Sequence, residues 1–253
     1  MILLKLEVDT HCHTVASGHA YSTVLENAKA AAAKGLKMIA ITDHGPSMPG
    51  GPHPYHFGNL KVLPRQIEGV LILRGVEANI LDYDGTLDLQ ENYLRNLDIV
   101  LAGFHTYCYP GGTVEENTRA AINAMKNPYV DVLVHPGNPE FPIDIDKVIE
   151  AAIEYGVHIE INNSSFTVSR RGSEENCLLI AKKAAKLGAK IVVGSDAHIC
   201  FDVGNFEKAL KVIEEAGLPE ENILNTSVEK VISYLKSKGR EMPAVRREPG
   251  AKI

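Results

Sequence analysis

Asp9-Thr10-His11-Cys12-His13 is the stretch that decides the fold, and it follows an apolar run at residues 2–8 that predicts a first β-strand. Alternate side chains of a strand share one face. His11 and His13 therefore point the same way, whereas Cys12 points to the opposite face and is not expected to bind a metal. Two imidazoles on one face at the end of a strand are suited to hold a metal ion.

A matching stretch lies near the other end of the chain. Ser195-Asp196-Ala197-His198 follows a second apolar run at residues 191–193, and Asp196 and His198 have the same alternate spacing. We expect the fold to bring the first and last strands side by side, so that both pairs of side chains face one ion cluster. The segments between them should supply the remaining ligands.

Between these two stretches, apolar runs that predict strands alternate with helical segments. Alternation of this kind predicts parallel strands covered by helices. Ser22 and Ser173 are expected to cap two of the helices. We expect strands at residues 2–8, 38–42, 71–76, 99–104, 130–134, 157–162 and 191–195, and helices at 22–34, 118–125, 145–155, 173–187, 206–216 and 227–238.

The positions of the polar residues favour a barrel over an open sheet. They fall at the C-terminal ends of six predicted strands, the face at which (β/α) barrels collect their active sites. An open doubly wound sheet would concentrate them at one switch point, and no Gly-x-Gly-x-x-Gly follows the first strand. We expect one α/β barrel domain over residues 1–239 and an exposed C-terminal tail over residues 240–253.

The composition is that of an ordinary soluble globular protein, with 253 residues, 45% hydrophobic and 23% charged. A formal net charge of −6 does not suit a long nucleic-acid groove, so extended nucleic acid is not an expected partner. The four Cys form no C-x-x-C pair, and the apolar runs are too short for a signal peptide or a membrane span. We therefore expect a cytoplasmic protein without membrane contact, and a homo-oligomer is compatible with the sequence.

Nine candidate metal ligands lie at the strand ends or in the first loop. A lone His at a strand end is more often a hydrogen-bonding loop residue than a ligand, as we expect for the packing residue His158, but nine such groups on one face favour metal binding. A catalytic zinc site typically uses three protein ligands, so nine divide into three sites. Imidazole and carboxylate without thiolate favour zinc, manganese or iron(II). The candidates are His11, His13, His19, His44, Glu77, His105, His135, Asp196 and His198.

Taken together, these motifs resemble the PHP (polymerase and histidinol phosphatase) family, and most of all its stand-alone YcdX-type phosphatases. The resemblance covers residues 9 to about 225, and the segments 17–22, 42–46 and 160–166 carry the closer match. The matching motifs are Asp9-Thr10-His11-Cys12-His13-Thr14, Ile41-Thr42-Asp43-His44, Gly75-Val76-Glu77, Gly103-Phe104-His105, His135-Pro136-Gly137 and Gly194-Ser195-Asp196-Ala197-His198.

The resemblance implies a distorted (β/α)7 TIM-like barrel with a site for three divalent metal ions, zinc first and manganese or iron as alternatives. Glu77 would bridge two of the ions. The implied ligands are His11, His13, Glu77 and Asp196 for the first ion, Glu77, His105 and His135 for the second, and His19, His44 and His198 for the third.

The activity that the resemblance implies is metal-dependent phosphoesterase (phosphatase) activity on a small phosphate monoester. A bound divalent ion lowers the pKa of its water toward 7. We therefore hypothesise that a hydroxide bridging two ions attacks phosphorus in line while the ions stabilise the developing charge. We assign catalytic roles to Glu77, Asp196 and His198.

Three further residues are candidate substrate contacts. Arg170 and Arg171 could grip phosphate through a guanidinium fork, although a solvated basic turn explains them equally well. His56 lies in segment 46–64, whose five Pro argue against regular helix and which could cover the substrate or simply pack on its own aromatics. Asp43 is expected to orient a ligand from behind.

Three other functions fit parts of this pattern. Amidohydrolase barrels, which act on amides or lactones, also open with His-x-His and close with Asp, but no Lys lies at a strand end after Glu77. A PHP-type nuclease acting on nucleic-acid ends is a second alternative: the acidic balance counts against a long nucleic-acid groove, but a mononucleotide or an end could still enter the site. A non-catalytic module that uses metal only for stability is the third alternative. It would not need the complete ligand set that this sequence has.

Overall fold

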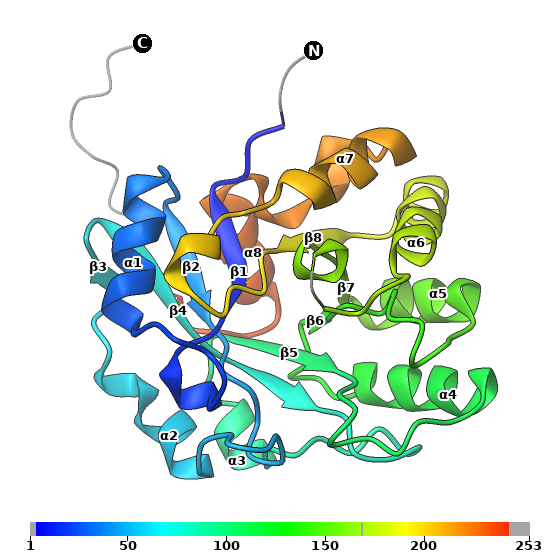
Figure 1. The fold of residues 1–253 in the computed structure, drawn as a ribbon, viewed down its shortest axis with the longest axis horizontal. Helices are drawn as coiled ribbons and strands as arrows, with labels where there is room; N and C mark the ends of the chain where they lie inside the picture. Colours follow the sequence, from blue (N-terminus) through cyan, green and yellow to red (C-terminus); the bar gives the residue numbers. More distant parts are fainter. Residues whose placement is uncertain (1–3, 168, 243–253) are drawn as a thin grey trace.

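The computed structural model describes residues 4–167 and 169–242, and in this part of the chain seven parallel strands follow one another in chain order around a barrel (Figure 1). The predicted α/β TIM-like barrel is therefore confirmed. An extra short strand, β3 (Gln66–Ile67), pairs antiparallel with β4 and was not predicted. The barrel strands are β1 (Val8–Cys12), β2 (Met38–Ile41), β4 (Val70–Asn79), β5 (Ile99–Gly103), β6 (Val132–Leu133), β7 (His158–Asn162) and β8 (Ile191–Gly194).

Helices cover the outside of the barrel, and one helix closes an end of it. Helix α8 packs Val228, Val231 and Leu235 against inward-facing strand residues such as Met38 and Leu101, which together form an inner core. The described helices are α1 (Val24–Ala33), α2 (Pro54–Asn59), α3 (Glu91–Leu94), α4 (Val114–Met125), α5 (Ile145–Tyr155), α6 (Glu174–Leu187), α7 (Glu207–Ala216) and α8 (Val228–Ser237), with short 3-10 helices η1 (Val15–Ser17), η2 (Leu60–Val62), η3 (Ser164–Phe166), η4 (Cys200–Asp202), η5 (Glu220–Asn222) and η6 (Leu224–Thr226).

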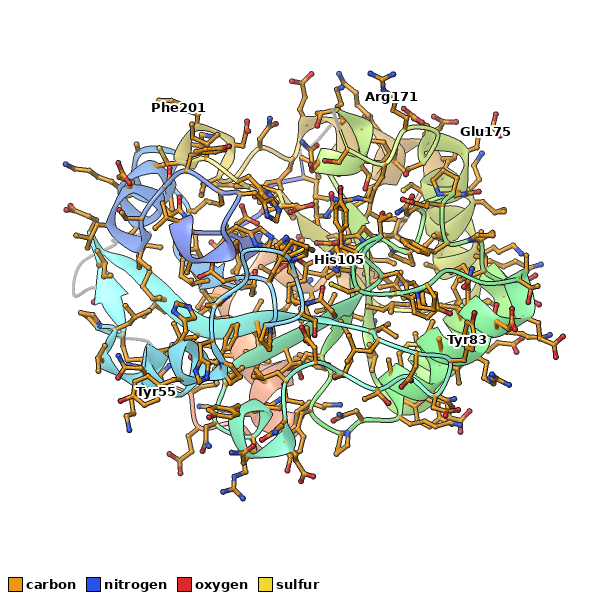
Figure 2. The ribbon with its side chains drawn as sticks, turned by 60° about the horizontal axis from the view of Figure 1, so that its bottom comes forward. Tyr55, Tyr83, His105, Arg171, Glu175 and Phe201 are labelled. Carbon is orange, nitrogen blue, oxygen red and sulfur yellow. The ribbon has the colours of Figure 1, made fainter. Side chains whose placement is uncertain are left out.

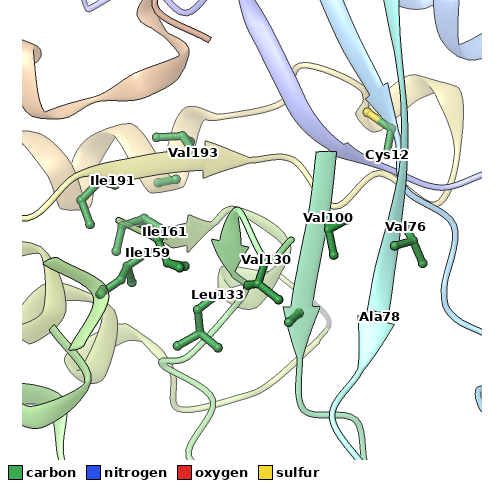
Figure 3. Packing of buried hydrophobic residues seen from close by; sticks show 14 of the residues in the cluster. Cys12, Val76, Ala78, Val100, Val130, Leu133, Ile159, Ile161, Ile191 and Val193 are labelled. Carbon is green, nitrogen blue, oxygen red and sulfur yellow. The ribbon is translucent and has the colours of Figure 1, made fainter. Parts of the chain in front are cut away.

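The outward strand faces form a second, larger core beneath the covering helices. Figure 3 shows Cys12 in this core together with Ile159, Ile161, Ile191 and Val193. Because side chains alternate along a strand, the residues between these positions point into the barrel. The prediction that Cys12 faces away from the histidines is confirmed.

The first and last strands close the barrel through few direct contacts. The backbone N–H of His13 donates to the carbonyl of Ala197 at 2.9 Å, just beyond the end of β8. Further down the seam, the Asn225 side chain from η6 donates to the carbonyls of Val8 and Val193, at 2.8 Å each, and accepts the N–H of Val193 at 3.0 Å. One buried amide thus joins β1 to β8 where the strands do not pair directly.

Several helices differ at their N-terminal ends from the prediction, because the capping residues differ from those expected. Thr23, rather than Ser22, caps α1 through a capping box with Glu26, while the Ser22 hydroxyl accepts the N–H of Cys200. Ser173 precedes α6 as expected, but its hydroxyl bonds to the carbonyl of Arg170 and makes no capping bond. The predicted Ser22 cap is therefore wrong.

The two largest errors in helix placement also have local causes. Helix α4 begins at Val114 and not at residue 118, because Thr113 and Glu116 form a second capping box. Segment 46–64 contains α2, although we expected no regular helix there. Pro54 occupies its first turn, where a proline leaves no helical hydrogen bond unmade.

Arg240 corrects the expected exposure of the tail. Its side chain is buried and donates to the carbonyls of Leu94, at 3.1 Å, and Tyr129, at 2.8 Å. Residues 243–253 of the predicted tail lie outside the described residues. Among the residues that the structure does describe, no helix is both long and apolar enough to cross a membrane.

The buried ring of His158 predicts that the free energy of unfolding falls in acid. The ring packs edge-on against Tyr234 with centroids 4.2 Å apart, and burial, with Lys190 and Lys238 nearby, lowers its pKa to about 3. In the unfolded chain the pKa returns to about 6.5. Between these values the unfolded chain binds more protons, so stability present above pH 6.5 is lost as the pH falls.

We therefore expect His158→Phe to remove part of this acid sensitivity. Between pH 7 and pH 5 the wild type should lose about 2 kcal/mol more unfolding free energy than the variant, measured by urea unfolding at both pH values. The other histidines are the same in both proteins, so their contributions cancel when the two losses of unfolding free energy are subtracted. Equal losses in the two proteins would contradict the assignment.

Candidate metal centre

The nine predicted ligands converge at the carboxyl ends of the strands, and Figure 2 shows one of them, His105, at the centre of this face. Rings that are far apart in sequence lie in contact: His13 is 4.3 Å from His198 and 4.4 Å from His44 between centroids. His19 stacks at 4.9 Å on His44. The strand-end pattern therefore brought together side chains from six strands and the first loop.

Two of these ligands are aimed by unusual backbone conformations. His135 has a φ of 37° and Asp196 a φ of 55°, each directly after a strand region. A non-glycine residue in this conformation costs about 1–3 kcal/mol and persists where the surroundings fix it. At both positions the turn directs the side chain back into the cluster.

The first group of ligand atoms consists of His11 Nε2, His13 Nε2 and Asp196 Oδ1. The two nitrogens are 3.1 Å apart, and the carboxylate oxygen lies 3.6 Å from the first and 3.2 Å from the second. An ion with bonds of about 2.1 Å to tetrahedral ligands separates them by about 3.4 Å. The three atoms therefore have the spacing that a single zinc-sized ion requires.

Glu77 lies between two further groups of imidazoles. Its Oε1 is 2.8 Å from His135 Nε2 and 3.2 Å from His105 Nε2. Its Oε2 is 2.7 Å from His44 Nδ1 and 3.3 Å from His11 Nε2. Oε1 thus faces one pair of nitrogens, and Oε2, which is also 3.4 Å from His13 Nε2, faces three others, as expected of a carboxylate shared between ions.

Several of these buried atoms make no hydrogen bond, although His44 Nδ1 and Glu77 Oε2 lie only 2.7 Å apart. They include His44 Nδ1, Glu77 Oε2 and both ring nitrogens of His105, and one atom from each residue lies within 4.8 Å of the others. A buried polar atom without a partner costs about 1–3 kcal/mol. A bound cation would be a partner for His44 Nδ1, Glu77 Oε2 and one ring nitrogen of His105, so the donor set fits a divalent metal site.

Charges within the cluster keep its carboxylates ionised. Burial would raise the pKa of Glu77, but His11, His44 and His105 hold it well below the ordinary value. Burial would likewise raise the pKa of Asp196, but His11 and Arg170 hold it well below the ordinary value. Ionised carboxylates are the forms that bind cations.

The central imidazoles differ in pKa: against the effect of burial, Glu160, Glu77 and Asp196 hold the pKa of His11 well above its ordinary value, whereas the pKa values of His13 and His135 are lowered. Burial, followed by the neighbouring His198 and His44, lowers the pKa of His13 well below its usual range. Burial, followed by the Arg170 guanidinium, lowers the pKa of His135 to about 4. Neutral imidazole is the metal-binding form, so these two rings need not lose a proton to bind an ion at neutral pH.

A polar chain fixes the orientation of His13. Its Nδ1 lies 3.0 Å from Ser17 Oγ, which in turn donates to Asp43 Oδ1 at 2.7 Å. The hydroxyl proton is directed to Asp43, so Nδ1 of His13 must donate and Nε2 is left free for a metal. The prediction that Asp43 orients a ligand from behind is consistent with this geometry, and the role of Ser17 was missed.

The candidate substrate contacts lie in three different environments. Arg170 is on the cavity wall, paired with Asp196 and donating to Ser165 Oγ at 2.9 Å. Arg171 is exposed and lies at the outer edge of the molecule in Figure 2. His56 Nε2 lies 3.4 Å from Asp43 Oδ2, and neither His56 nor Arg171 lines the cavity.

A cavity of about 730 Å³ lies over the cluster, and its lining includes five of the nine predicted ligands. Met48, Pro49, Phe104 and Phe141 supply apolar wall, and polar groups are interspersed among them. This volume lies within the range typical of small-molecule sites. The ligands in the lining are His19, His44, His105, Asp196 and His198.

Two buried residues of the site were not predicted. Glu160 and Asn162 lie in β7, at alternate positions that face the barrel interior, with Glu160 Oε1 2.8 Å from His11 Nδ1. A charged residue between two isoleucines in the middle of a strand was the available signal. Its spacing of two from Asn162 could have indicated a shared inward face.

Comparisons with known proteins found a matching family and similar sequences. The model of the PHP domain matches residues 9–240. A probable phosphatase from Caldanaerobacter subterraneus subsp. tengcongensis is 61% identical over 240 residues, which cover 94% of each chain. A probable phosphatase from Acetivibrio thermocellus is 59% identical over 235 residues, which cover 93% of this chain and 97% of that one.

Solved structures of low sequence identity share the fold. The histidinol phosphate phosphatase from Lactococcus lactis subsp. lactis, complexed with zinc, L-histidinol and phosphate, superposes with a TM-score of 0.57 at 16% identity. The match covers 84% of this chain and 94% of that chain.

Proposed function

Because this chain belongs to the PHP domain family, we propose that it is a metal-dependent phosphatase that hydrolyses a small phosphate monoester at a site for three divalent ions. The single observation that carries the proposal is Glu77, whose two oxygens face different imidazoles at 2.7–3.4 Å. Close relatives described as probable phosphatases support it.

The ligand assignment is the one that the resemblance to the PHP family implies, and the grouping of His11, His13 and Asp196 supports its first site. His11, His13 and Asp196 would hold the first ion and His105 and His135 the second, with Glu77 shared. His19, His44 and His198 would hold the third. Zinc suits the imidazole-rich set and the tetrahedral spacing, and manganese or iron(II) are the alternatives.

When bound, divalent ions at this site would supply hydroxide at neutral pH and neutralise charge on the phosphoryl oxygens. The chain itself supplies the orientation. Asp43 and Ser17 hold His13 in one tautomer, and Arg170 presents a guanidinium to the cavity. A planar fork of N–H donors suits two oxygens of a phosphate dianion.

The cavity walls indicate the kind of alcohol that leaves. Phe104 and Phe141, with ring centroids 5.5 Å apart and planes tilted by 35°, line the cavity together with Met48, while Asn138 and Glu140 add polar groups. A phosphate monoester whose alcohol has both an apolar face and hydrogen-bonding groups matches this lining. An extended polymer does not match a cavity of about 730 Å³.

A substrate screen tests the proposed function. The protein, loaded in turn with zinc, manganese and iron(II), would be assayed against phosphomonoesters, phosphodiesters, amides and lactones while its metal content is measured. We expect monoester turnover that a chelator abolishes and added metal restores. Turnover of amides or lactones alone would show that the chain is an amidohydrolase-type enzyme instead.

Arg170 provides a separate test of phosphate binding. We expect Arg170→Gln to raise KM for a phosphomonoester about 10- to 100-fold, because one charge-assisted contact contributes about 1.5–3 kcal/mol. Steady-state kinetics would measure KM and kcat. Arg171→Gln is the matched control, since its side chain is exposed, and it should leave both constants near wild type.

The opposite pattern would overturn the Arg170 assignment. If KM were unchanged in Arg170→Gln and raised in Arg171→Gln, the exposed arginine would be the phosphate contact. Metal content must be compared as well, because Arg170 also pairs with Asp196. A variant that retains its metal and has a raised KM isolates the contact with phosphate.

A further inference from the structure

We propose that Glu160 is a positioning residue that keeps the imidazole proton of His11 on Nδ1 and links the ligands of two ions through one carboxylate. The inference rests on the proposed metal site and goes beyond it, because Glu160 is not among the nine ligands. Its side chain is 1% exposed and lies within the barrel, behind the ligand atoms.

Both oxygens of Glu160 are engaged by donors. Oε1 lies 2.8 Å from His11 Nδ1, and Oε2 accepts the backbone N–H of His135 at 2.9 Å. Oε2 also accepts Asn162 Nδ2 at 3.0 Å, and the same amide nitrogen is 3.2 Å from Asp196 Oδ2. One carboxylate therefore contacts His11 and His135 directly and Asp196 through Asn162.

These contacts define the tautomer of His11. A carboxylate that receives N–H groups from a backbone amide and a side-chain amide acts as an acceptor, so the imidazole must donate to it from Nδ1. Nε2 then carries the lone pair and faces His13 Nε2 at 3.1 Å. His11 can bind an ion only in this form, and an anionic partner makes its free nitrogen more basic.

The backbone of β8 reserves the space for this carboxylate. A Cβ atom at Gly194 would lie 2.0 Å from Glu160 Oε1 and 3.0 Å from His11 Cβ. Any side chain at Gly194 would therefore push Glu160 or His11 out of place. A glycine at a strand end with an ordinary φ is explained here by the close approach of the carboxylate.

The two ligands of β1 are positioned by different chemistry. His13 donates from Nδ1 to the neutral hydroxyl of Ser17, whereas His11 donates to a buried anion. A carboxylate partner and a hydroxyl partner orient a ring equally well, but only the carboxylate adds negative charge next to the ions. Glu160 therefore strengthens metal binding beyond its effect on geometry.

The test measures zinc binding and the His11 tautomer, and it needs no substrate. We expect Glu160→Gln to weaken zinc binding about 10- to 100-fold, measured by competition with a chromophoric chelator. Glu150→Gln, the same change at an exposed position of α5, should bind zinc as the wild type does. In zinc-loaded wild-type protein labelled with ¹⁵N-histidine, NMR should show the His11 proton on Nδ1.

Two results would overturn this inference. One is a Glu160→Gln protein that melts at a lower temperature yet binds zinc with wild-type affinity, which would make Glu160 merely structural. The other is a His11 proton on Nε2 in the zinc-loaded wild type, a measurement that does not depend on whether the variant folds. If monoesters are not hydrolysed while both expected results are obtained, the proposed function fails and the role of Glu160 stands.

Discussion

Replacing Glu77 by Gln is expected to lower kcat/KM for a phosphomonoester about 1,000-fold and to reduce the number of bound metal ions. The change removes the charge that faces His11, His44, His105 and His135 while keeping the shape of the side chain. Loss of about 4 kcal/mol of transition-state stabilisation corresponds to that factor in rate. Kinetics and elemental analysis of the same preparation would measure both effects.

A surface change of the same chemistry is the control for Glu77. Glu175→Gln, in the exposed first turn of α6, should retain full activity and full metal content. A Glu77→Gln protein with wild-type turnover and wild-type metal content would remove Glu77 from the site. Reduced turnover with unchanged metal content would limit its role to catalysis.

The second large effect is expected at the seam of the barrel. Asn225→Leu should lower the free energy of unfolding by about 3–5 kcal/mol, because it leaves three buried backbone groups of Val8 and Val193 without partners. For a chain of this length that corresponds to a fall in melting temperature of roughly 10 °C. Urea unfolding and thermal melts of metal-free protein would measure it.

An exposed asparagine provides the comparison for Asn225. Asn205→Leu makes the same substitution outside the core and should change the unfolding free energy by less than about 0.5 kcal/mol. If Asn225→Leu were equally mild, water or a shifted backbone would have to replace the lost bonds. The side-chain amide would then not be what joins β1 to β8.

The gathering of the ligands was predictable because two simple rules determine it. Alternation along a strand placed His11 and His13 on one face, and the barrel rule placed every strand end on the same side. Neither rule requires knowledge of loop conformation. The fold class and the convergence of the eight strand-end ligands therefore followed from the sequence, whereas His19 reaches the cluster from the first loop.

The errors arose at positions where tertiary packing or backbone conformation determines the direction or the burial of a side chain. Arg170 and Arg171 are adjacent, and only the turn around Arg170, with its φ of 48°, determines which side chain faces the cavity. Glu160 lies in mid-strand, and its inward direction depends on the register with β8. Arg240 is buried because two distant carbonyls, those of Leu94 and Tyr129, accept its guanidinium.

The position of Asn225 also bears on how the chain acquires its shape during synthesis. β1 is among the first segments to leave the ribosome, yet the side chain that joins it to β8 comes 217 residues after Val8. Contacts of such long sequence separation form slowly, since a large loop must close first. Until η6 and α8 arrive, β1 has an unpaired edge and the barrel an open end, so the nascent chain exposes both to other proteins until the last helix docks.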